Sequence, residues 1–485
     1  MSEIRNIQTN EPIRVRFAPS PTGIMHLGNI RTALMNFLFA RQKNGIFVLR
    51  IEDTDPQRDF DPEGRQIIQD LEWLGLSYDE GPHKGGPYAP YYQSQRSAIY
   101  QEQLNVLIKN KSVYRCFCTT TELETKRQRQ ITLKQPPRYD QTCYKLSKEA
   151  IADKLAIDTP FIWRFHIDQN KKAEFKDLGH GNMSFDLVNF SDFPLTRQDG
   201  SFTFIFANCV DDIAMKINYV FRGDDHTSNT VNQVVLYQAF NAKLPIYWHM
   251  PIICNLEGKK LSKREFGFSL RDLREAGFLS EAINNYLSII GASFENEILT
   301  LDEIIAQYNF DNISSANQIK YDVEKLRWIN HKWIGQLDTQ ELLKRCMPIL
   351  EKNYSDIAQQ DHNTLLNLIA LVQTDLVTLN DVVPAVRFYF IKPVIASDQI
   401  QAIKPNAPLE KISKILSNNL ELLKDSENFL KIVTVTAKEA GIKLSDMMPI
   451  IRMILTGSPQ GPHIGQIITI LGWQEAEARF QSYFG

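Results

Sequence analysis

Near the N-terminus, the spacing of apolar residues changes from that of a strand to that of a helix. Residues 14–17 alternate as in a short strand, and residues 18–28 carry two prolines, two glycines and small side chains. Apolar side chains then recur at helical intervals, at Ile30, Ala33, Leu34, Phe37 and Leu38. We expect this helix to end near Asn44-Gly45, and the apolar run 46–51 is typical of a parallel strand covered on both faces. The pattern predicts a βαβ unit.

A second unit of the same kind is predicted much later in the chain. Residues 218–221 have the pattern of a strand, 228–240 that of a helix and 246–254 that of another strand. Between the two halves lies an insert, roughly 97–203, with apparent strands at 161–167 and 183–187. We therefore expect an α/β fold, a Rossmann-type nucleotide-binding domain that carries an α+β insert.

Beyond about residue 272, strand patterns become rare, and the C-terminal part, about 200 residues, is predicted to be a helical array that ends in an all-helical region. Amphipathic patterns recur at 281–290, 323–328, 339–350, 363–377 and 409–423. Prolines at positions 393, 405 and 408 predict a boundary between two helical bundles near residue 400.

The composition indicates a globular protein of several domains. The chain has 485 residues, of which 43% are hydrophobic and 23% charged, so two to five domains are expected. With 54 basic and 57 acidic residues the net charge is -3, and any RNA must be bound by local basic faces. Residues 1–12 are polar and no apolar stretch is long enough to cross a membrane. We expect a soluble, cytoplasmic protein without a membrane partner.

The loop from Pro19 to Asn29 is a candidate phosphate site because of its position. It follows a strand and opens a helix, where backbone N–H groups and the helix dipole favour an anion. Its spacing is that of neither the dinucleotide glycine pattern nor a P-loop. The loop offers an imidazole, His26, two residues before Gly28, but His-x-Gly alone favours an ordinary turn with a hydrogen-bonded histidine.

A second candidate is the basic stretch Lys260-Leu-Ser-Lys-Arg264. Its three cations within five residues could neutralise a triphosphate as pyrophosphate leaves. Taken alone, such a turn is usually solvated surface.

Together, these motifs carry a resemblance. Arg16-Phe-Ala-Pro-Ser-Pro-Thr-Gly23 with His26-Leu-Gly-Asn29 resembles the first signature of the class I aminoacyl-tRNA synthetases, and Lys260-Leu-Ser-Lys-Arg264 resembles the second. Between them, Arg50-Ile-Glu-Asp-Thr-Asp55 and Arg222-Gly-Asp-Asp-His-Thr-Ser-Asn-Thr230 are similar to the glutamate branch. The helical C-terminal half resembles that of the bacterial glutamyl-tRNA synthetases, so the resemblance covers essentially the whole chain.

The resemblance implies a division into six segments. Residues 1–96 and 204–255 are the two halves of the Rossmann-type catalytic domain, 97–203 an acceptor-stem-binding insert, 256–335 a stem-contact domain with the second signature, and 336–398 and 399–485 two helical anticodon-binding subdomains.

The implied activity is the ligation of L-glutamate to the 3′ end of tRNA(Glu) through glutamyl-adenylate, with ATP and Mg²⁺, in a monomer. The residues implied for catalysis and ATP are His26, Gly28, Asn29, Lys260, Ser262, Lys263 and Arg264. Those implied for glutamate are Arg16, Ala18, Ser20, Glu52, Phe204, Asn208 and Arg222. Arg16 would bind the side-chain carboxylate, Glu52 the ammonium group and Arg222 the α-carboxylate. Exchange of pyrophosphate into ATP is expected to require tRNA.

One position departs from the family. Relatives commonly have Pro-Thr-Tyr where this chain has Phe202-Thr203-Phe204, so a tyrosine hydroxyl expected in the glutamate pocket is absent. The loss of a hydrogen bond to a carboxylate costs about 1.5 to 3 kcal/mol unless a water or another group replaces it.

Three cysteines in the insert indicate a zinc site. Cys116, Cys118 and Cys143 supply three thiols, and structural zinc requires four ligands. Some bacterial relatives have a histidine two residues after the third cysteine, where this chain has Lys145, which cannot ligate when charged. Tyr139 has the Tyr-x3-Cys spacing of a shortened relative that modifies queuosine-containing tRNA, which makes it the candidate fourth ligand. The alternative is a metal-free remnant of such a site.

Other functions remain as alternatives. The long helical half argues against a glutaminyl enzyme and against the shortened relative. The retained signatures argue against a non-catalytic tRNA-binding paralogue. An enzyme that also charges, or is directed to, tRNA(Gln) stays open. Many relatives have Arg and Lys near 373–379, where this chain reads Gln-Thr-Asp-Leu-Val-Thr-Leu.

Overall fold

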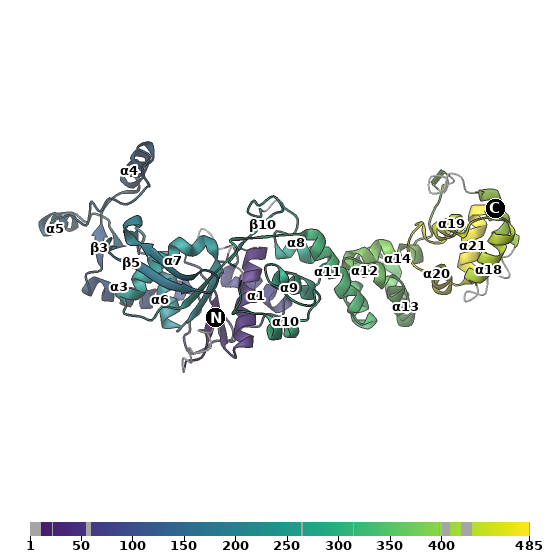
Figure 1. Cartoon of the computed structure of the whole chain (residues 1–485), viewed down its shortest axis with the longest axis horizontal. Coiled ribbons are helices and arrows are strands. Elements are labelled where there is room, and N and C mark those ends of the chain that lie inside the picture. The colour runs from purple at the N-terminus through teal and green to yellow at the C-terminus, as the bar shows by residue number, and fades with distance from the viewer. Residues whose placement is uncertain are drawn as a thin grey trace. The chain divides into compact units, whose positions relative to one another are not determined.

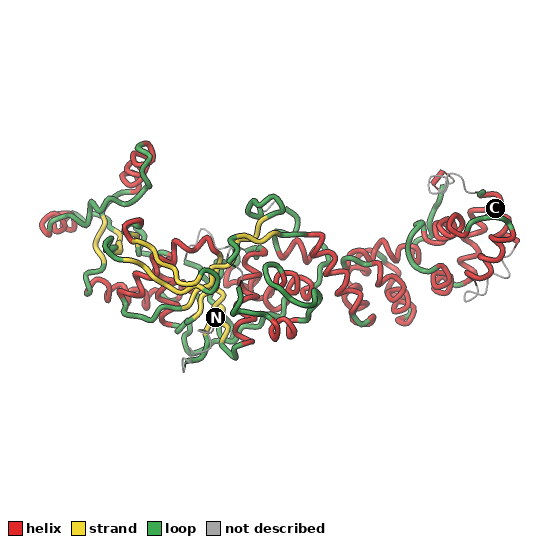
Figure 2. Tube along the Cα trace, in the orientation of Figure 1, coloured by secondary structure: helices red, strands yellow, loops and turns green. Residues whose placement is uncertain are grey.

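The computed structural model describes residues 11–21, 23–54, 60–262, 265–313, 315–396, 398–399, 408–418 and 429–484. The chain divides into two compact units. The first contains Met1–Asp272 and Asn284–Val323, and the second contains Leu273–Ile283 and Glu324–Gly485. Figure 1 labels the elements of both, and Figure 2 shows that the strands of the described residues belong to the first unit.

The first unit opens with the βαβ arrangement that the sequence predicted. Strand β1 (Arg14–Phe17) and strand β2 (Ile46–Leu49) are parallel, with Arg14 opposite Ile46 and Phe17 opposite Leu49. Helix α1 (Leu27–Gln42) connects them and is buried along most of its length because other elements cover it on several sides. The turn at Asn44-Gly45 requires a glycine, since a Cβ on Gly45 would lie 2.7 Å from the Ile13 carbonyl oxygen.

The second half-fold is also confirmed. Strands β8 (Tyr219–Gly223) and β9 (Ile246–Met250) are parallel and are connected by helix α7 (Thr227–Ala239). Asn218 N–H donates to the Arg14 carbonyl at 3.1 Å, which places β8 beside β1 and joins the two halves. The predicted strand 246–254 is split at Pro251, which has no N–H. Its second part, β10 (Ile252–Cys254), pairs in parallel with β11 (Gln318–Lys320).

The insert contributes strands to two sheets, which the sequence pattern did not reveal. Strands β3 (Val113–Cys116), β4 (Ile162–Phe165) and β7 (Phe193–Pro194) form an antiparallel sheet. Strands β5 (Lys172–Asp177) and β6 (Gly181–Asp186) form a hairpin that extends the other sheet, in the order β6-β5-β9-β8.

The remaining helices before β8 are α2 (Arg65–Trp73), α3 (Ser97–Lys109), α4 (Thr120–Thr132), α5 (Lys148–Ala156) and α6 (Phe204–Ala214).

All described elements of the second unit are helical, as predicted. Helices α8 (Leu270–Glu275) and α9 (Ser280–Ile289) occupy the stretch of sequence where the chain passes between the units, and α10 (Leu301–Gln307) belongs to the first. The second unit continues with α11 (Val323–Gln336), α12 (Thr339–Asn353), α13 (His362–Val372), α14 (Val382–Phe390), α16 (Leu409–Asn418), α18 (Phe429–Glu439), α19 (Leu444–Thr456), α20 (Ile464–Leu471) and α21 (Trp473–Phe484).

Two predictions in this half reach residues outside the described ranges. The helix predicted at 409–423 is described as far as Asn418, and of the prolines predicted to mark a boundary, Pro405 lies outside the described residues. The helix predicted at 363–377 ends at Val372, because the Gln373 side chain turns back to donate to the carbonyl oxygens of Ile334 and Leu337.

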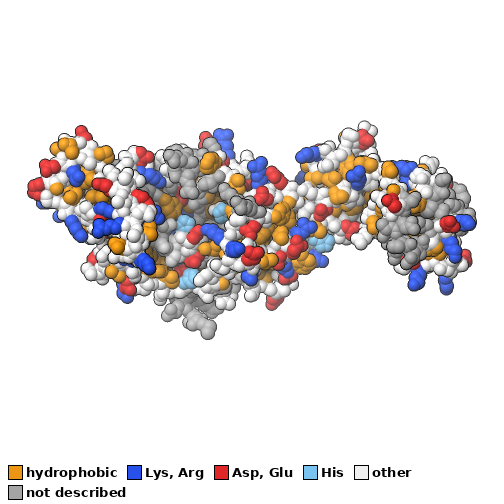
Figure 3. Space-filling model, turned by 90° about the horizontal axis from the view of Figure 1, so that it is seen from above, with side chains coloured by type: hydrophobic (Ala, Val, Ile, Leu, Met, Phe, Trp, Pro, Cys, Tyr) orange, Lys and Arg blue, Asp and Glu red, His pale blue; other side chains and the backbone are white. Residues whose placement is uncertain are grey.

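The surface is mixed in charge. On the face shown in Figure 3, Lys and Arg side chains are interspersed with Asp and Glu, in agreement with the net charge of -3. Across the described part of the chain, no helix combines the length and the apolar character needed to cross a membrane.

Candidate functional site

A cavity of about 410 Å³ lies in the first unit, where the strands β1 and β8 end and helix α1 begins. Most of the predicted site residues described by the structure line it: Arg16, Ala18, Ser20, His26, Gly28, Asn29, Glu52, Phe204, Asn208, Arg222 and Lys260. Ser262 is exposed and is not part of the lining, while Lys263 and Arg264 lie outside the described residues. Two separately predicted motifs therefore border one cavity.

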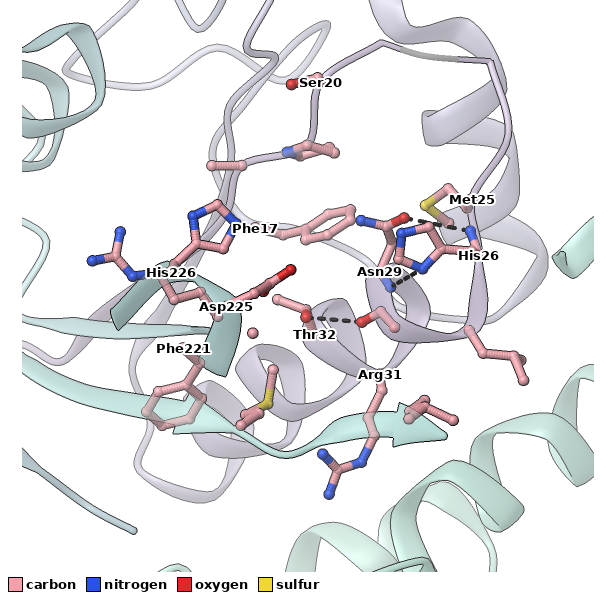
Figure 4. A pocket seen from close by; sticks show the side chains of 18 of the residues that line it. Phe17, Ser20, Met25, His26, Asn29, Arg31, Thr32, Phe221, Asp225 and His226 are labelled. Carbon is pink, nitrogen blue, oxygen red and sulfur yellow. Dashed lines mark hydrogen bonds between the residues drawn. The ribbon is translucent and has the colours of Figure 1, made fainter. Parts of the chain in front are cut away.

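His26 caps the N-terminus of α1 at the cavity wall (Figure 4). The Asn29 N–H donates to His26 Nδ1 at 3.3 Å, and the His26 N–H donates to Asn29 Oδ1 at 3.4 Å. Burial lowers the pKa of His26, and the nearby Lys260 ammonium lowers it further, so the ring is neutral. Since Nδ1 accepts a hydrogen bond, the proton is on Nε2, which remains a donor.

The absence of a side chain at Gly28 leaves room for the His26 ring. A Cβ on Gly28 would lie 3.0 Å from His26 Cε1 and 3.1 Å from Nδ1. The sequence suggested that this glycine lets a ligand approach the backbone; in the structure, its first effect is to leave room for the imidazole.

The two signature segments are held at the cavity by backbone pairing. Leu27 N–H donates to the Phe268 carbonyl at 3.0 Å, and Leu270 N–H donates to the Met25 carbonyl at 2.9 Å. The second signature folds back on β10 through the Leu261 N–H, and Lys260 Nζ donates to Asp225 Oδ2 at 3.1 Å. In Figure 4, Asp225 and His226 lie across the cavity from His26 and Asn29.

Arg16 lies at the base of the cavity in a buried ionic network. Its Nε is 3.2 Å from Asp212 Oδ1, which also accepts from Arg50 NH1 at 2.7 Å. Burial would raise the pKa of Asp212, but the charges of Arg16 and Arg50 lower it below its usual value. Asp212 thus fixes the Arg16 guanidinium and neutralises part of its charge.

Glu52 and Asn208 form a second polar group on the cavity wall. Asn208 Nδ2 donates to Glu52 Oε1 at 2.5 Å, and Arg50 NH2 donates to the same oxygen at 3.1 Å. Burial raises the pKa of Glu52 above its usual value. A cation in the cavity would be attracted to this carboxylate and would favour its ionised form.

Arg222 is a buried cation without a carboxylate partner. Its NH2 donates to Thr230 Oγ1 and, at 2.7 Å, to Gln233 Oε1. None of the ion pairs among the described residues includes Arg222, and burial lowers its pKa to about 10. At neutral pH it still carries its charge, which favours an anionic ligand.

Phe204 lines the cavity with an aromatic ring that has no hydroxyl. Its ring centroid is 5.9 Å from that of His226, whose pKa is lowered to about 4 by burial and by the charge of Arg222. The His226 Nδ1 is 3.1 Å from Asn229 Nδ2. A neutral imidazole therefore lies beside the position that lacks the expected hydroxyl.

The predicted metal ligands converge in the insert. The sulfur atoms of Cys116, Cys118 and Cys143 all lie within 4.8 Å of one another. Tyr139 Oη is 3.3 Å from Cys116 Sγ and 3.7 Å from Cys118 Sγ. Four donors around a zinc ion, with Zn–S of about 2.3 Å, lie roughly 3.8 Å apart, so this donor set fits a tetrahedral site.

Two surface segments have side chains that are paired within the protein. In the basic stretch 126–129 of the insert, Lys126 pairs with Asp140 at 2.9 Å and Arg127 with Glu124 at 3.4 Å. Near the segment 373–379, the Asp381 carboxylate accepts from the backbone of Val377 and Thr378, while Asp375 is exposed.

Sequence reasoning missed Asp212 and Gln233, which orient Arg16 and Arg222, two of the three arginines that line the cavity. A signal for the aspartate was present: Asp211-Asp212 interrupts the apolar run 204–214, and aspartates are rarely buried unless they are paired. Gln233 shows no such signal, because a glutamine in a helix is ordinarily exposed.

Comparisons with known proteins agree with the motifs. The family described as "tRNA synthetases class I (E and Q), catalytic domain" matches residues 12–328, and "Anticodon binding domain" matches residues 340–484. A glutamate–tRNA ligase of Sulfurihydrogenibium sp. is 36% identical, over 97% of this chain and 100% of its own. The glutamate–tRNA ligase of Bacillus subtilis is 32% identical, over 97% and 99%.

A solved structure shares the fold over nearly the whole length. The crystal structure of a glutamate tRNA ligase from Elizabethkingia meningosepticum, in complex with its amino acid, has a TM-score of 0.88 and 29% identity. The match covers 98% of this chain and 99% of that one.

Proposed function

The chain belongs to the glutamate–tRNA ligase family of class I tRNA synthetases, and on this premise we propose that it ligates L-glutamate to the 3′ end of tRNA(Glu). A glutamate carboxylate oxygen attacks the α-phosphorus of ATP, so that a P–O bond forms and pyrophosphate leaves. A hydroxyl of the terminal ribose of tRNA then attacks the carbonyl carbon of glutamyl-adenylate, and AMP leaves. No enzyme side chain is required as a nucleophile.

The observation that carries the proposal is the charge pattern of the cavity. Arg16, Glu52 and Arg222 line the same space and are connected by hydrogen bonds through Asp212, Arg50, Asn208 and Gln233. The other charged residues of the lining are Arg31, Asp225 and Lys260. Glutamate has two carboxylates and one ammonium group, which is the set complementary to Arg16, Arg222 and Glu52. We assign Arg16 to the side-chain carboxylate, Arg222 to the α-carboxylate and Glu52 with Asn208 to the ammonium group, with Ala18, Ser20 and Phe204 as further lining.

ATP is proposed to bind at the start of α1. The helix N-terminus, the free donor on His26 Nε2 and the backbone N–H of Gly28 favour phosphate oxygens there, beside Asn29. Lys260 lies on the same cavity and would attract the same anion, with Ser262, Lys263 and Arg264 as the rest of the signature. Mg²⁺ accompanying ATP would neutralise phosphate charge. Catalysis then rests on positioning and electrostatic stabilisation.

Pyrophosphate exchange tests this assignment. With tRNA(Glu) present, glutamate should support exchange into ATP, and glutamine should not, because an amide offers Arg16 no charged carboxylate in addition to that of Asp212. We expect little exchange without tRNA, since family members assemble the ATP site when the acceptor end docks. Equal exchange with both amino acids would contradict the charge assignment, and full exchange without tRNA would contradict the induced fit.

We also propose that the insert holds a structural zinc ion through Cys116, Cys118, Cys143 and Tyr139. Support comes from the convergence of three sulfur atoms and one phenol oxygen, and from Phe117 N–H, which donates to Cys143 Sγ at 3.3 Å as it would to a thiolate. The ion would tie together segments that also share a small hydrophobic cluster around Cys116, Phe117 and Cys143.

The tRNA partner is proposed to be tRNA(Glu), with tRNA(Gln) as the alternative. The exposed Asp375 supports that alternative, because an aspartate cannot contact a phosphate or a guanine edge as an arginine would. We propose that the protein acts as a monomer in the cytoplasm, where its three substrates meet; gel filtration tests the monomer.

A further inference from the structure

Behind Arg222, three buried polar side chains form a continuous series of hydrogen bonds. Arg222 NH2 donates to Thr230 Oγ1, which lies 2.6 Å from His249 Nε2. His249 Nδ1 lies 2.8 Å from Asp177 Oδ2. Asp177, Thr230 and His249 are each at most 2% exposed, so water does not compete for these bonds.

The direction of each hydrogen bond follows from Asp177. Its carboxylate accepts from the backbone N–H groups of Gly179, His180 and His249, at 2.8 to 2.9 Å. An ionised carboxylate can only accept, so His249 Nδ1 must carry a proton and donate to it. Burial lowers the pKa of His249, which keeps the ring neutral and leaves Nε2 as an acceptor.

The tautomer of His249 also determines how the Thr230 hydroxyl interacts with Arg222. Its single hydroxyl proton points to His249 Nε2, and its oxygen lone pairs then face the Arg222 NH2 group. The alternative acceptor for that proton, the His226 carbonyl, is farther away at 3.2 Å. With this tautomer of His249, Thr230 is fixed as an acceptor toward the guanidinium.

The side chains that accept from Arg222 are uncharged, so Arg222 keeps its positive charge for a ligand. Thr230 and Gln233 orient the Arg222 guanidinium without neutralising it, whereas Asp212 both orients Arg16 and cancels part of its charge. The carboxylate of Asp177 lies two side chains further back. Arg222 is therefore held in place with its charge available to an anion in the cavity.

The series also explains why the β5–β6 hairpin joins the sheet. Asp177 is the last residue of β5 and pairs with Tyr247 on β9, and α7, which carries Thr230, packs against β5 (Figure 1). A strand of the insert is thus connected to Arg222 on β8 through His249 on β9 and Thr230 on α7.

We propose that Asp177, His249 and Thr230 are positioning residues for glutamate: together they hold the Arg222 guanidinium where it meets the α-carboxylate. The inference rests on the proposed role of Arg222 in glutamate binding.

The test compares Thr230→Val, which keeps the shape and removes the hydroxyl, with Thr230→Ser, which restores it. Asp177→Asn tests the far end of the series. Its matched control is Asp186→Asn on the same hairpin, where Asp186 is exposed and pairs only with Lys172. For each variant, the glutamate KM, the ATP KM and kcat of aminoacylation are measured together with the melting temperature.

We expect Thr230→Val and Asp177→Asn to raise the glutamate KM roughly three- to tenfold, the effect of one neutral hydrogen bond, with the ATP KM within about twofold of the wild type. Thr230→Ser and Asp186→Asn should resemble the wild type. A Thr230→Val enzyme with an unchanged glutamate KM would overturn the proposal, as would parallel rises in both KM values. If Asp177→Asn does not fold, the comparison of Thr230→Val with Thr230→Ser still tests the proposal.

The variant Arg222→Gln distinguishes a failure of the proposed role of Arg222 from a failure of the positioning network. If this variant leaves the glutamate KM unchanged, the proposed role of Arg222 itself is wrong. If it raises the glutamate KM at least tenfold while the Thr230 and Asp177 variants do not, the role of Arg222 stands and only the positioning network is rejected.

Discussion

At the level of single residues, a few close contacts decide how the cavity handles charge. His26 is neutral because it is buried and faces Lys260, and a side chain at residue 28 would press on its ring. Arg16 shares Asp212 with Arg50, while Arg222 has only neutral acceptors. Small changes at these contacts should therefore affect catalysis more than stability.

Gly28→Ala tests the fit of the His26 ring. The new Cβ would force the ring to move, and we expect the rate of glutamyl-adenylate formation to fall about tenfold, because phosphate groups must be aligned closely for transfer. The melting temperature should stay the same or rise, since alanine is the better helix former. The measurement is pyrophosphate exchange with tRNA(Glu) present.

Gly335→Ala is the matched control, because its Cβ would meet nothing within 4 Å in helix α11. It should gain about 0.5–1 kcal/mol of stability with an unchanged rate. Equal rates for the two variants would show that the position of the His26 ring does not matter.

Lys260→Ala should shift the pH dependence of adenylate formation. The Lys260 charge lowers the pKa of His26 and the Asp225 charge raises it, so removing the lysine raises the pKa of His26. Protonation of Nδ1 abolishes the cap on Asn29, and the acid limb of the pH–rate profile should move to higher pH. Lys259→Ala, an exposed neighbour paired with Glu257, should leave the acid limb in place. A shift in the opposite direction would contradict the account.

The residues that face the cavity could largely be predicted, but their supports could not. Arg16, Glu52 and Arg222 stand in recognisable motifs. Asp212 contacts Arg16 from 196 positions away, and Asp177 contacts His249 from 72 positions away. No local pattern shows such pairings, because they depend on how the strands are ordered in the sheet.

At the level of elements, the insert shows where periodicity is informative and where it fails. The βαβ units were predicted from apolar runs because their strands are buried. Strand β5 alternates exposed and buried residues but was missed, because only two of its six residues, Ala173 and Phe175, are apolar. The cysteine cluster was found because closely spaced thiols are typical of a metal site, and its three sulfur atoms do converge.

The zinc site makes a prediction for this part of the insert. Purified protein should contain about one zinc per chain, and Cys118→Ser should lose it, because three ligands rarely retain a structural ion. The affinity should fall as the pH is lowered, since the thiols and the Tyr139 phenol, whose pKa burial raises above its ordinary value, must lose protons to ligate. Elemental analysis and competition with a chromogenic chelator provide the measurement.

Tyr139→Phe identifies the fourth ligand. If the phenol ligates zinc, this variant should release the ion more readily, and Lys145→His in the same background should restore retention by supplying an imidazole. Unchanged retention in Tyr139→Phe would exclude the phenol. Protein purified without chelators and free of zinc would show that the cluster has lost its metal function.

At the level of the whole molecule, the chain combines a cavity for small substrates with a separate helical unit. The cavity is built entirely from the first unit, and the family matches divide the chain at residues 328 and 340, close to the division at Val323. Fold and activity were predictable because four motifs and the helical half agree. The choice of tRNA was not, because it depends on surface side chains that have no fixed spacing.

Aminoacylation of purified tRNA tests the central claim most directly. The protein is incubated with ATP, Mg²⁺, radiolabelled glutamate and, in separate reactions, tRNA(Glu) or tRNA(Gln), and acid-precipitable label is counted. We predict glutamyl-tRNA(Glu), formed with one AMP and one pyrophosphate per product, and no product with glutamine as the amino acid. Label only on tRNA(Gln) would favour the alternative partner. No glutamyl-tRNA with either tRNA, or a preference for glutamine, would contradict the account.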